Sequence, residues 1–319
     1  MAITFEPAVL RPLPELVTAF NDAFRGYVGG EITLDTVSFG HFLHRQGVDL
    51  SASVVAMDDL GEVAGLALMG RRGWTARLAA MGVTSGAQEK GVGRALVYDL
   101  LRAARERGDR YVELEVIRTN PRGVRLYQGA GFRAVQALLG FELPAIGAAA
   151  ETTTDALADA APYADDVPHT DSATVGQAVG QAVGQAVGQA VDAPVAVDPY
   201  LVTQAVGRYA DEDTPWQASE TLLSSYGAPV RGFRAGPAWA MMVPARAGKA
   251  ALLALVVEPG ARGEGHGSGL LAALRAMEPE AVLTVPPVCP ERYQPFFERA
   301  GARVTELSQW QMRIDLQGG

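Results

Sequence analysis

Apolar residues in the first 144 positions recur in two periods, that of a helix face and that of a strand. Apolar side chains at helical spacing over residues 16–27 predict a helix that begins after Pro12 or Pro14. Strands are predicted at residues 3–5, 53–57, 63–69, 78–83, 111–117 and 132–143. Further helices are predicted at residues 37–43, 94–108 and 121–129. The predicted order is therefore β-α-α-β-β-β-α-β-α-β.

Part of this order is repeated after residue 199. Helices are predicted at residues 201–209, 216–226 and 292–300, and another follows the turn within residues 257–271. Strands are predicted at residues 238–243, 250–257, 281–285 and 309–316. Fewer strands precede the turn than in the first half, so we expect the second copy to be abbreviated.

The segment between the two copies differs in composition. Residues 145–198 are rich in Ala, Asp, Thr and Pro, and Gly-Gln-Ala-Val occurs four times in succession over residues 176–191. A glycine at every fourth position costs a helix about 1 kcal/mol each relative to alanine. We therefore expect a mobile or weakly helical linker. The predicted domains are residues 1–144 and 199–319.

The acidity of the chain resides in this linker. The net charge is −9, yet eight acidic residues lie within residues 151–198, and the rest of the chain is close to −1. No Lys or Arg occurs between Arg133 and Arg208. The charge therefore indicates neither nucleic-acid nor membrane binding.

Composition also bounds the class of protein. Apolar residues make up 48% of the chain, as in an ordinary globular protein, and no apolar run is long enough to span a membrane. The N-terminus lacks the pattern of a signal peptide, and a single cysteine, Cys289, excludes an internal disulfide. We expect a cytoplasmic protein.

Two glycine-rich turns of equal spacing each join a predicted strand to a predicted helix. The first is Gln88-x-x-Gly91-x-Gly93 and the second is Arg262-x-x-Gly265-x-Gly267. Glycine lets the backbone approach a ligand closely, and the first N–H groups of the following helix are free to bind an anion. Together with the helix dipole, these donors predict a pyrophosphate site in each copy.

The two turns resemble the acyl-CoA-binding signature of the GNAT family of N-acetyltransferases, Val-x-Pro-x-x-Arg/Gln-x-x-Gly-x-Gly/Ala. The second turn fits it fully, with Pro259 and Arg262, whereas the first has Ser85 for the proline. The resemblance implies an α/β fold with a mixed sheet and helices on both faces, present as two GNAT-type domains in tandem. It also implies acetyl-CoA as the acyl donor. The residues implied to bind it are Met81, Gly82, Val83, Gln88, Glu89, Lys90, Gly91, Val92, Gly93, Arg94, Asn120, Tyr127, Val257, Arg262, Gly263, Gly265, His266 and Gly267.

Residues 114–132, LEVIRTNPRGVRLYQGAGF, resemble the second signature of the same family. Carried over from the ribosomal-protein N-terminal acetyltransferases, the resemblance implies that Glu115 is the catalytic base and Tyr127 the catalytic acid. It implies that Asn120 contacts the pantetheine arm or a water, and that Val83 offers its N–H to the thioester oxygen. Glu113 shares a strand face with Glu115 and competes for the role of base. Tyr127 also fits a packing role between helix and sheet.

The second copy lacks these polar groups. Aligning the two copies places Val285, Pro290 and Phe297 opposite Glu115, Asn120 and Tyr127. We therefore expect the first copy to catalyse, and the second to bind acyl-CoA without turnover or only to support the fold.

The sequence leaves several functions open. The first is transfer of an acetyl group to an amine, with a small amine, an antibiotic, a peptide N-terminus or a lysine as acceptor. The alternatives are a non-catalytic acyl-CoA sensor or scaffold, and an acetyltransferase similar to mycothiol synthase. His41 and His44 lack the further ligands of a metal site, so we expect no metal. We expect a monomer with an internal pseudo-dimer, or a homodimer.

Overall fold

The computed structural model describes residues 2–30, 32–146 and 193–317. These residues form two compact units. The first unit contains residues 2–137 and 307–317, and the second contains 138–146 and 193–306. The four Gly-Gln-Ala-Val repeats of the predicted linker lie outside the described residues.

The first unit is a mixed sheet with strand order β1-β2-β3-β4-β5-β12. Its strands are β1 (Thr4–Pro7), β2 (Val54–Met57), β3 (Val63–Arg72), β4 (Thr75–Val83), β5 (Tyr111–Ile117) and most of β12 (Arg303–Asp315). Its helices are α1 (Leu13–Ala23), α2 (Thr36–Arg45), α3 (Val92–Glu106) and α4 (Pro121–Gly129). The side chain of Asn120 accepts a hydrogen bond from the N–H of Gly123, and Pro121 is the first helical residue, so local sequence determines where α4 begins.

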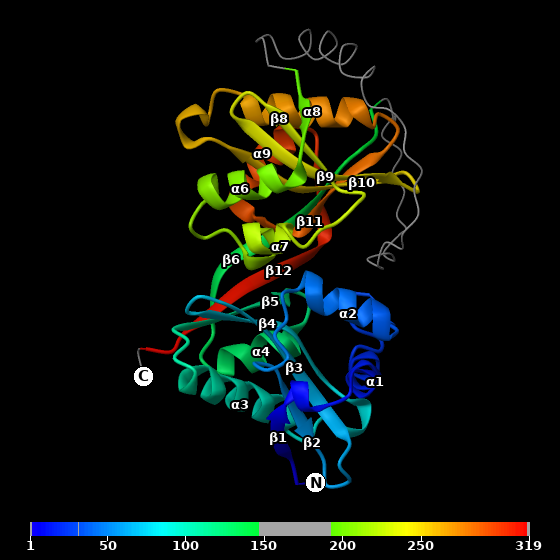
Figure 1. The fold of residues 1–319 in the computed structure, drawn as a ribbon, viewed down its shortest axis with the longest axis vertical. Helices are drawn as coiled ribbons and strands as arrows, with labels where there is room; N and C mark the ends of the chain where they lie inside the picture. The colour runs from blue at the N-terminus through cyan, green and yellow to red at the C-terminus, as the bar shows by residue number, and fades with distance from the viewer. Residues whose placement is uncertain (1, 31, 147–192, 318–319) are drawn as a thin grey trace. The chain divides into compact units, whose positions relative to one another are not determined.

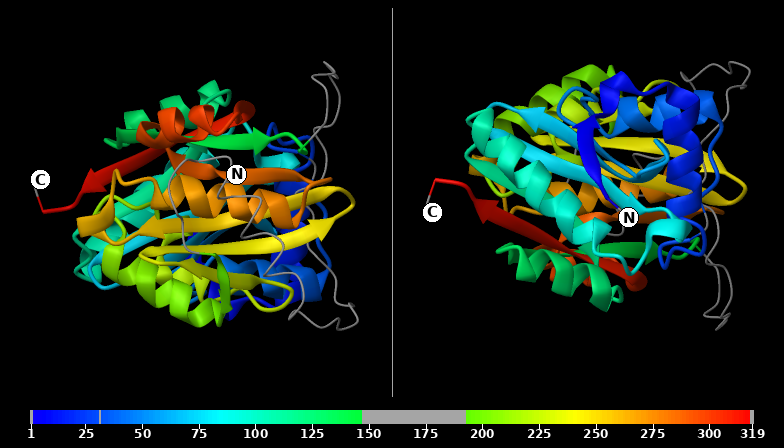
Figure 2. Two further views of the ribbon diagram at one scale, coloured as in Figure 1. Left: turned by 90° about the horizontal axis from the view of Figure 1, so that it is seen from above. Right: turned by 90° about the horizontal axis from the view of Figure 1, so that it is seen from below.

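Helices cover both faces of this sheet (Figure 1; Figure 2, right). Apolar residues of α3 and α4 pack with Leu78, Val112 and Leu114 on one face. Those of α1 and α2 pack with Leu66 and Leu68 on the other face. The predicted arrangement of a mixed sheet between helices is confirmed.

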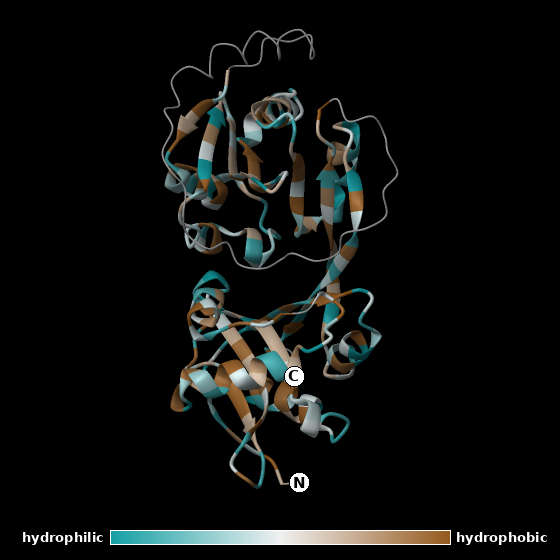
Figure 3. Cartoon of the chain, turned by 90° about the vertical axis from the view of Figure 1, so that its right-hand side faces the viewer, coloured by the Kyte–Doolittle hydropathy of each residue, from teal (hydrophilic) through white to brown (hydrophobic). Residues whose placement is uncertain are grey.

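The second unit repeats this arrangement with strand order β6-β11-β10-β9-β8-β7. Its strands are β7 (Val195–Val197), β8 (Arg231–Ala235), β9 (Ala238–Arg246), β10 (Lys249–Val257), β11 (Val282–Pro290) and the end of β6 (Arg133–Leu143). Its helices are α6 (Pro199–Tyr209), α7 (Glu220–Leu223), α8 (His266–Met277) and α9 (Gln294–Arg299). One core lies between the sheet and α8 with α9, and another between the sheet and α6 with α7 (Figure 1). Hydrophobic and hydrophilic residues alternate along strands of both units (Figure 3).

The second unit contains two strands that the sequence pattern did not predict. β7 and β8 precede β9 and β10, so four strands come before the glycine-rich turn, as in the first unit. Both are short, and β7 lies within the range predicted as linker. The second copy is therefore abbreviated in its helices rather than in its strands, because α7 has four residues where α2 has ten.

The closing strand of each unit comes from the other half of the sequence. Residues 309–315 of β12 pair antiparallel with β5, and residues 138–143 of β6 pair antiparallel with β11. Compared with the predicted ranges 1–144 and 199–319, the first unit therefore gains the end of β12 and loses the end of β6. The second unit gains the end of β6 and also β7, and loses the end of β12. An alternating pattern specifies that a segment is a strand and which side faces the core, but not which strand it pairs with.

The central parallel strands of each unit diverge in the same way. β4 pairs with β5 only as far as Leu78 with Leu114, and β10 pairs with β11 only as far as Ala251 with Thr284. A bulge follows at once in each case, because the pairing of β4 with β3 skips Ala79 and that of β10 with β9 skips Leu253. Each bulge lies nine positions before the first residue of the glycine-rich turn, Gln88 or Arg262. A bulge bends the strand that carries it, and here it turns the end of the strand away from its neighbour.

Candidate functional site

The two glycine-rich turns have matching backbone geometry. Gly91 and Gly265 are the residues directly before α3 and α8, and both are left-handed, with φ of 81° and 90°. No side chain caps either helix. A Cβ atom on Gly93 or Gly267 would lie 3.4 or 3.3 Å from Cγ2 of the valine that ends the preceding strand. The glycines thus bring each helix close to its strand and leave the first N–H groups of the helix uncapped.

The first residue of each motif secures the turn to the strand before it. Gln88 donates from Nε2 to the carbonyl oxygen of Val83 at 3.3 Å, and Arg262 donates from Nε to that of Val257 at 3.2 Å. This shared contact explains why either Gln or Arg serves at this position, since both supply an N–H at the required reach.

Several other predicted loop residues are engaged with the protein. Lys90 donates from Nζ to the carbonyl oxygen of Gly86 at 2.6 Å, and Glu89 lies 3.6 Å from Arg122 in an exposed ion pair. Arg94 places its guanidinium 5.4 Å from the ring centre of Tyr98. The remaining predicted loop positions provide backbone, and Met81, Gly82 and Val83 are half-buried at the end of β4, beyond its last pair with β5.

The departure of Ser85 from the motif has a structural reason. Its N–H donates to Oδ2 of Asp22 at 2.6 Å, and its hydroxyl donates to Oδ1 at 3.1 Å. Proline has no N–H and could not make the shorter bond. In the first unit, a carboxylate near the end of α1 therefore holds the entry to the loop.

Glu115 lies in a buried ion pair that the sequence did not reveal. Arg77 of β4 donates from Nε to Oε2 of Glu115 at 2.8 Å, and its NH2 lies 2.8 Å from the same oxygen. The side chains are 1% and 3% exposed. The other carboxylate oxygen, Oε1, is buried with no hydrogen-bond partner among the described residues. The only sequence signal for Arg77 is a charged residue inside an apolar strand.

Tyr127 and Asn120 lie together with a further tyrosine. The ring of Tyr127 is buried and meets Phe132 edge to face, with centroids 5.8 Å apart. Burial raises the pKa of the Tyr127 phenol well above its usual range, and nearby Tyr27 contributes. Burial also raises the pKa of Tyr27, although a hydrogen bond with the Asn120 side chain opposes this. α4 thus presents a phenol that stays protonated at neutral pH. The sequence pattern predicted Tyr27 only as part of the apolar helical face of residues 16–27, not as a neighbour of Tyr127.

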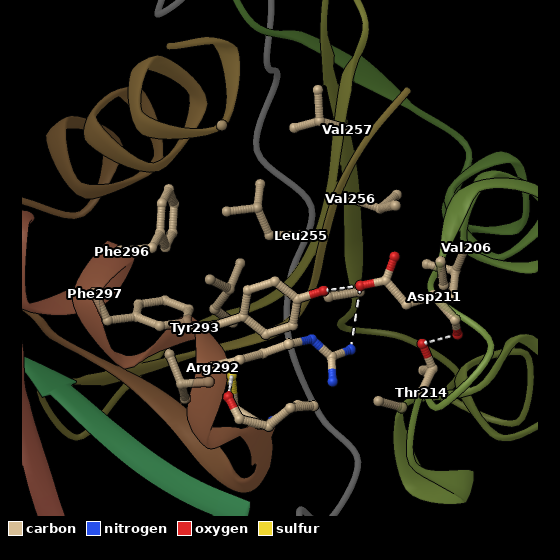
Figure 4. Close-up of a pocket in the computed structure, with 18 of the residues that line it drawn as sticks. Val206, Asp211, Thr214, Leu255, Val256, Val257, Arg292, Tyr293, Phe296 and Phe297 are labelled. Atoms are coloured by element: carbon tan, nitrogen blue, oxygen red, sulfur yellow. Dashed lines mark hydrogen bonds and ion pairs between the residues drawn. The ribbon is translucent and has the colours of Figure 1, made fainter. Parts of the chain in front are cut away.

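A cavity of about 660 Å³ lies in the second unit, beside the diverging strands and the Arg262–Gly267 turn. One wall is apolar and includes Leu255, Val256 and Val257 of β10, with Phe296 and Phe297 of α9 facing them (Figure 4). His266 and Gly263 line the cavity at the turn. Val285, Pro290 and Phe297, the residues aligned with Glu115, Asn120 and Tyr127, also line it. The cavity is therefore the counterpart of the region where the polar groups of the first unit are found.

Asp211 is the centre of the polar side of this cavity (Figure 4). Its Oδ1 accepts from NH1 of Arg262 at 2.8 Å, and its Oδ2 accepts from NH2 of Arg292 at 3.1 Å and from the hydroxyl of Tyr293. The Tyr293 hydrogen bond and the Arg262 guanidinium hold the pKa of the Asp211 carboxyl below its usual range, against the effect of burial. The local pattern of the motif does not reveal Asp211, which lies 51 positions before Arg262. Nor does it reveal Tyr293, which lies 82 positions after Asp211.

Tyr293 lies one helical turn before Phe297, so the second unit does place a phenol in its cavity. Burial, together with the hydrogen bond to Asp211, raises the pKa of Tyr293. The hydroxyl of Tyr293 already donates a hydrogen bond to the Asp211 carboxylate. This phenol is therefore a weaker acid than one without such a bond. The thiol of Cys289, also in the lining, has its pKa raised to about 12 by burial.

Over the described residues, no three His, Cys, Asp or Glu side chains gather in a way that could hold a metal ion. His41 and His44 belong to α2. In that same part of the chain, none of the helices has the length and apolar character needed to cross a bilayer.

The comparisons with known proteins agree with this geometry. Residues 14–132 match the acetyltransferase (GNAT) family. A tandem GNAT protein from the clavulanic acid biosynthesis pathway superposes with a TM-score of 0.56 at 15% identity, over 99% of each chain. GCN5-related N-acetyltransferases from Sphaerobacter thermophilus and Anabaena variabilis superpose with TM-scores of 0.55 and 0.61, at 15% and 13% identity. They cover 98% and 99% of this chain and 96% and 73% of their own. At such identities the structures establish a shared fold, and no curated protein matches the sequence.

Proposed function

We propose that this chain, a tandem member of the GNAT acetyltransferase family, transfers the acetyl group of acetyl-CoA to a primary amine and does so in its first unit. One observation carries the choice of unit. Glu115 lies where β4 separates from β5, and α4 carries the phenol of Tyr127, whereas the aligned residues in the second unit, Val285 and Phe297, are apolar. At these aligned positions, side chains that can transfer a proton are therefore found in the first unit and not in the second.

The residues of the first unit would divide the work as follows. The N–H groups that begin α3 bind the diphosphate of the acyl donor, and the end of β4 receives its pantetheine arm. An amine that attacks a thioester must lose a proton, and the thiolate that departs must gain one. Glu115 accepts the first proton through its unpartnered oxygen, directly or through a water, and the protonated phenol of Tyr127 supplies the second.

The second unit binds acyl-CoA without transferring its acyl group. In support, its cavity adjoins a turn that fits the motif fully, and it has apolar groups where the first unit has polar ones. Among the described residues that line this cavity, the phenol is that of Tyr293, and it is hydrogen-bonded to Asp211.

Two alternatives make different predictions. A non-catalytic acyl-CoA sensor would release no thiol above hydrolysis with any amine, because it would bind acyl-CoA without catalysing transfer to the amine. An enzyme similar to mycothiol synthase would act in the second unit, so its activity would survive loss of Tyr127. The acceptor itself is a small amine, an antibiotic, a peptide N-terminus or a lysine.

The test is release of free thiol from acetyl-CoA by the full-length chain with a panel of amines. The panel contains a polyamine, an aminoglycoside, a peptide with a free N-terminus and an N-acetylated peptide with one lysine. We expect at least one to raise thiol release above hydrolysis, and Glu115→Gln to abolish the increase. Thiol release that stays at the hydrolysis rate with every amine would favour the sensor.

A further inference from the structure

Glu115 lies at the point where β4 and β5 separate. The last pair between these strands is Leu78 with Leu114, so Glu115 is the first residue of β5 that has no partner on β4. Its side chain is 3% exposed, whereas the residue as a whole is half-buried. The exposed part is therefore its main chain, and the opening between the strands begins at this residue.

Arg77 fixes the Glu115 carboxylate from the neighbouring strand. Two of its guanidinium nitrogens, Nε and NH2, lie 2.8 Å from Oε2 of Glu115. The third, NH1, donates to Oε1 of Gln46 at 3.0 Å, and Gln46 is the residue that ends α2. A planar guanidinium bonded on both sides holds the carboxylate in one orientation. Rotation of the carboxylate would break a charge-assisted hydrogen bond from Nε and the ion-pair contact with NH2.

This arrangement uses one oxygen of Glu115 and leaves the other without a donor. Oε1 is buried and has no hydrogen-bond partner among the described residues. A buried carboxylate oxygen without a donor is costly, so such atoms in a native protein indicate a bound water or ligand. An N–H or O–H group of a bound molecule would supply the missing donor.

We propose that Arg77, held by Gln46, is a positioning residue for Glu115, and that it directs Oε1 to accept a hydrogen bond from the N–H of the acceptor amine. The inference rests on the proposed function, because it takes Glu115 as the group that meets the amine. Arg77 itself touches no substrate.

Other charged groups share this face of the sheet. Glu113 lies on β5 two residues before Glu115, and Arg313 of β12 lies 3.6 Å from it. Burial raises the pKa of Glu113, while Arg313 opposes this and the charge of Glu115 adds to it. Arg72 also acts on Glu113, and across β12 the neutral Gln311 stands opposite Glu115. Replacing Arg77 therefore changes the surroundings of Glu115 most directly, since Arg77 is the cation bonded to it.

The experiment follows the Glu115 carboxyl without requiring a known acceptor. NMR spectra of full-length protein labelled with ¹³C at the glutamate side-chain carboxyl are recorded at neutral pH, and Glu115→Gln identifies the signal. In Arg77→Gln, we expect a changed carboxyl chemical shift, because the carboxylate loses the guanidinium that orients it. Arg77→Lys keeps a charge but not the fork, so we expect a smaller change in chemical shift.

Arg71→Lys is the matched control. Arg71 donates from NH2 to the buried Asp109 at 2.9 Å in the same unit, and Arg107 also binds Asp109. This variant should leave the Glu115 signal unchanged. A Glu115 signal in Arg77→Gln with the parental chemical shift would overturn the inference. If Arg77→Gln does not fold, a parental chemical shift in Arg77→Lys would also overturn it.

Failure of the inference differs from failure of the proposed function. If no amine raises thiol release above hydrolysis, the proposed function fails. If Glu115→Gln keeps full thiol release with the best amine of the panel, acetyl transfer stands, but Glu115 is not the base and the inference fails. If Glu115→Gln is inactive while Arg77→Lys keeps parental kcat and a parental carboxyl signal, only the positioning role fails. We expect Arg77→Lys to lower kcat about 10-fold or more with little change in KM for acetyl-CoA, as for a displaced catalytic group.

Discussion

The backbone N–H of Ser85 donates to the Asp22 carboxylate over 2.6 Å, and this contact holds the entry to the first glycine-rich turn. The equivalent position in the second turn is Pro259, which has no N–H, and there Asp211 binds Arg262 instead. In both units, a carboxylate at the end of the first helix or just beyond it secures the turn, through different chemistry.

Restoring the proline of the motif should therefore weaken the first turn. We expect Ser85→Pro to raise KM for acetyl-CoA about fivefold, because an exposed hydrogen bond of this kind contributes about 1 kcal/mol. Steady-state kinetics with the best amine of the panel measures this. Ser85→Ala keeps the N–H and loses only the 3.1 Å hydroxyl bond, so its KM should stay nearer the parent. Equal KM values in all three proteins would show that the Asp22 contact does not support binding.

Tyr127→Phe should lower kcat by about 10² to 10⁴, the usual contribution of a general acid. Its affinity for acetyl-CoA, measured by calorimetry on the full-length chain, should change little, because only the hydroxyl is removed. Tyr200→Phe, at an exposed tyrosine of the second unit, is the matched control and should keep the parental rate. A Tyr127→Phe enzyme of parental rate would remove this phenol from the mechanism.

Asp211 should make stability depend on pH in the acid range. Its folded pKa is lowered by Tyr293 and Arg262, so the stability it contributes is present above the ordinary aspartate pKa and is lost as the pH falls through the folded value. We expect Asp211→Asn to lower the melting temperature at pH 7 and to differ less from the parent at pH 3. Thermal unfolding at several pH values measures this. Asp59→Asn, at an exposed turn residue, should follow the parent throughout.

Cys289 should be inert in the folded protein. With its pKa raised to about 12, the thiol is almost entirely protonated at pH 8, and the thiolate is the reactive form. Mass spectrometry after incubation with iodoacetamide should show negligible labelling without urea and full labelling in denaturing urea. Rapid labelling of the native protein would contradict the raised pKa of this half-buried thiol.

The features that the sequence predicted are local ones. The strand, the glycine spacing and the helix start at Asn120 each depend on neighbours within a few residues, and the structure has them where expected. The contacts that it did not predict join distant positions. Arg77 of β4 binds Glu115 of the neighbouring strand β5, 38 positions later in the chain. Asp211 binds Tyr293, 82 positions later. No local pattern records such a pairing, because each partner taken alone resembles a solvated polar residue.

The exchange of closing strands also has a consequence for synthesis. The sheet of the first unit is complete only when residues 309–315 lie beside β5, and these are synthesised after residues 193–306 of the second unit. The edge of β5 therefore stays unpaired until β12 has been synthesised. A chain terminated before β12 would lack the final strand of the unit that contains Glu115 and Tyr127, although every residue of its motifs had been made.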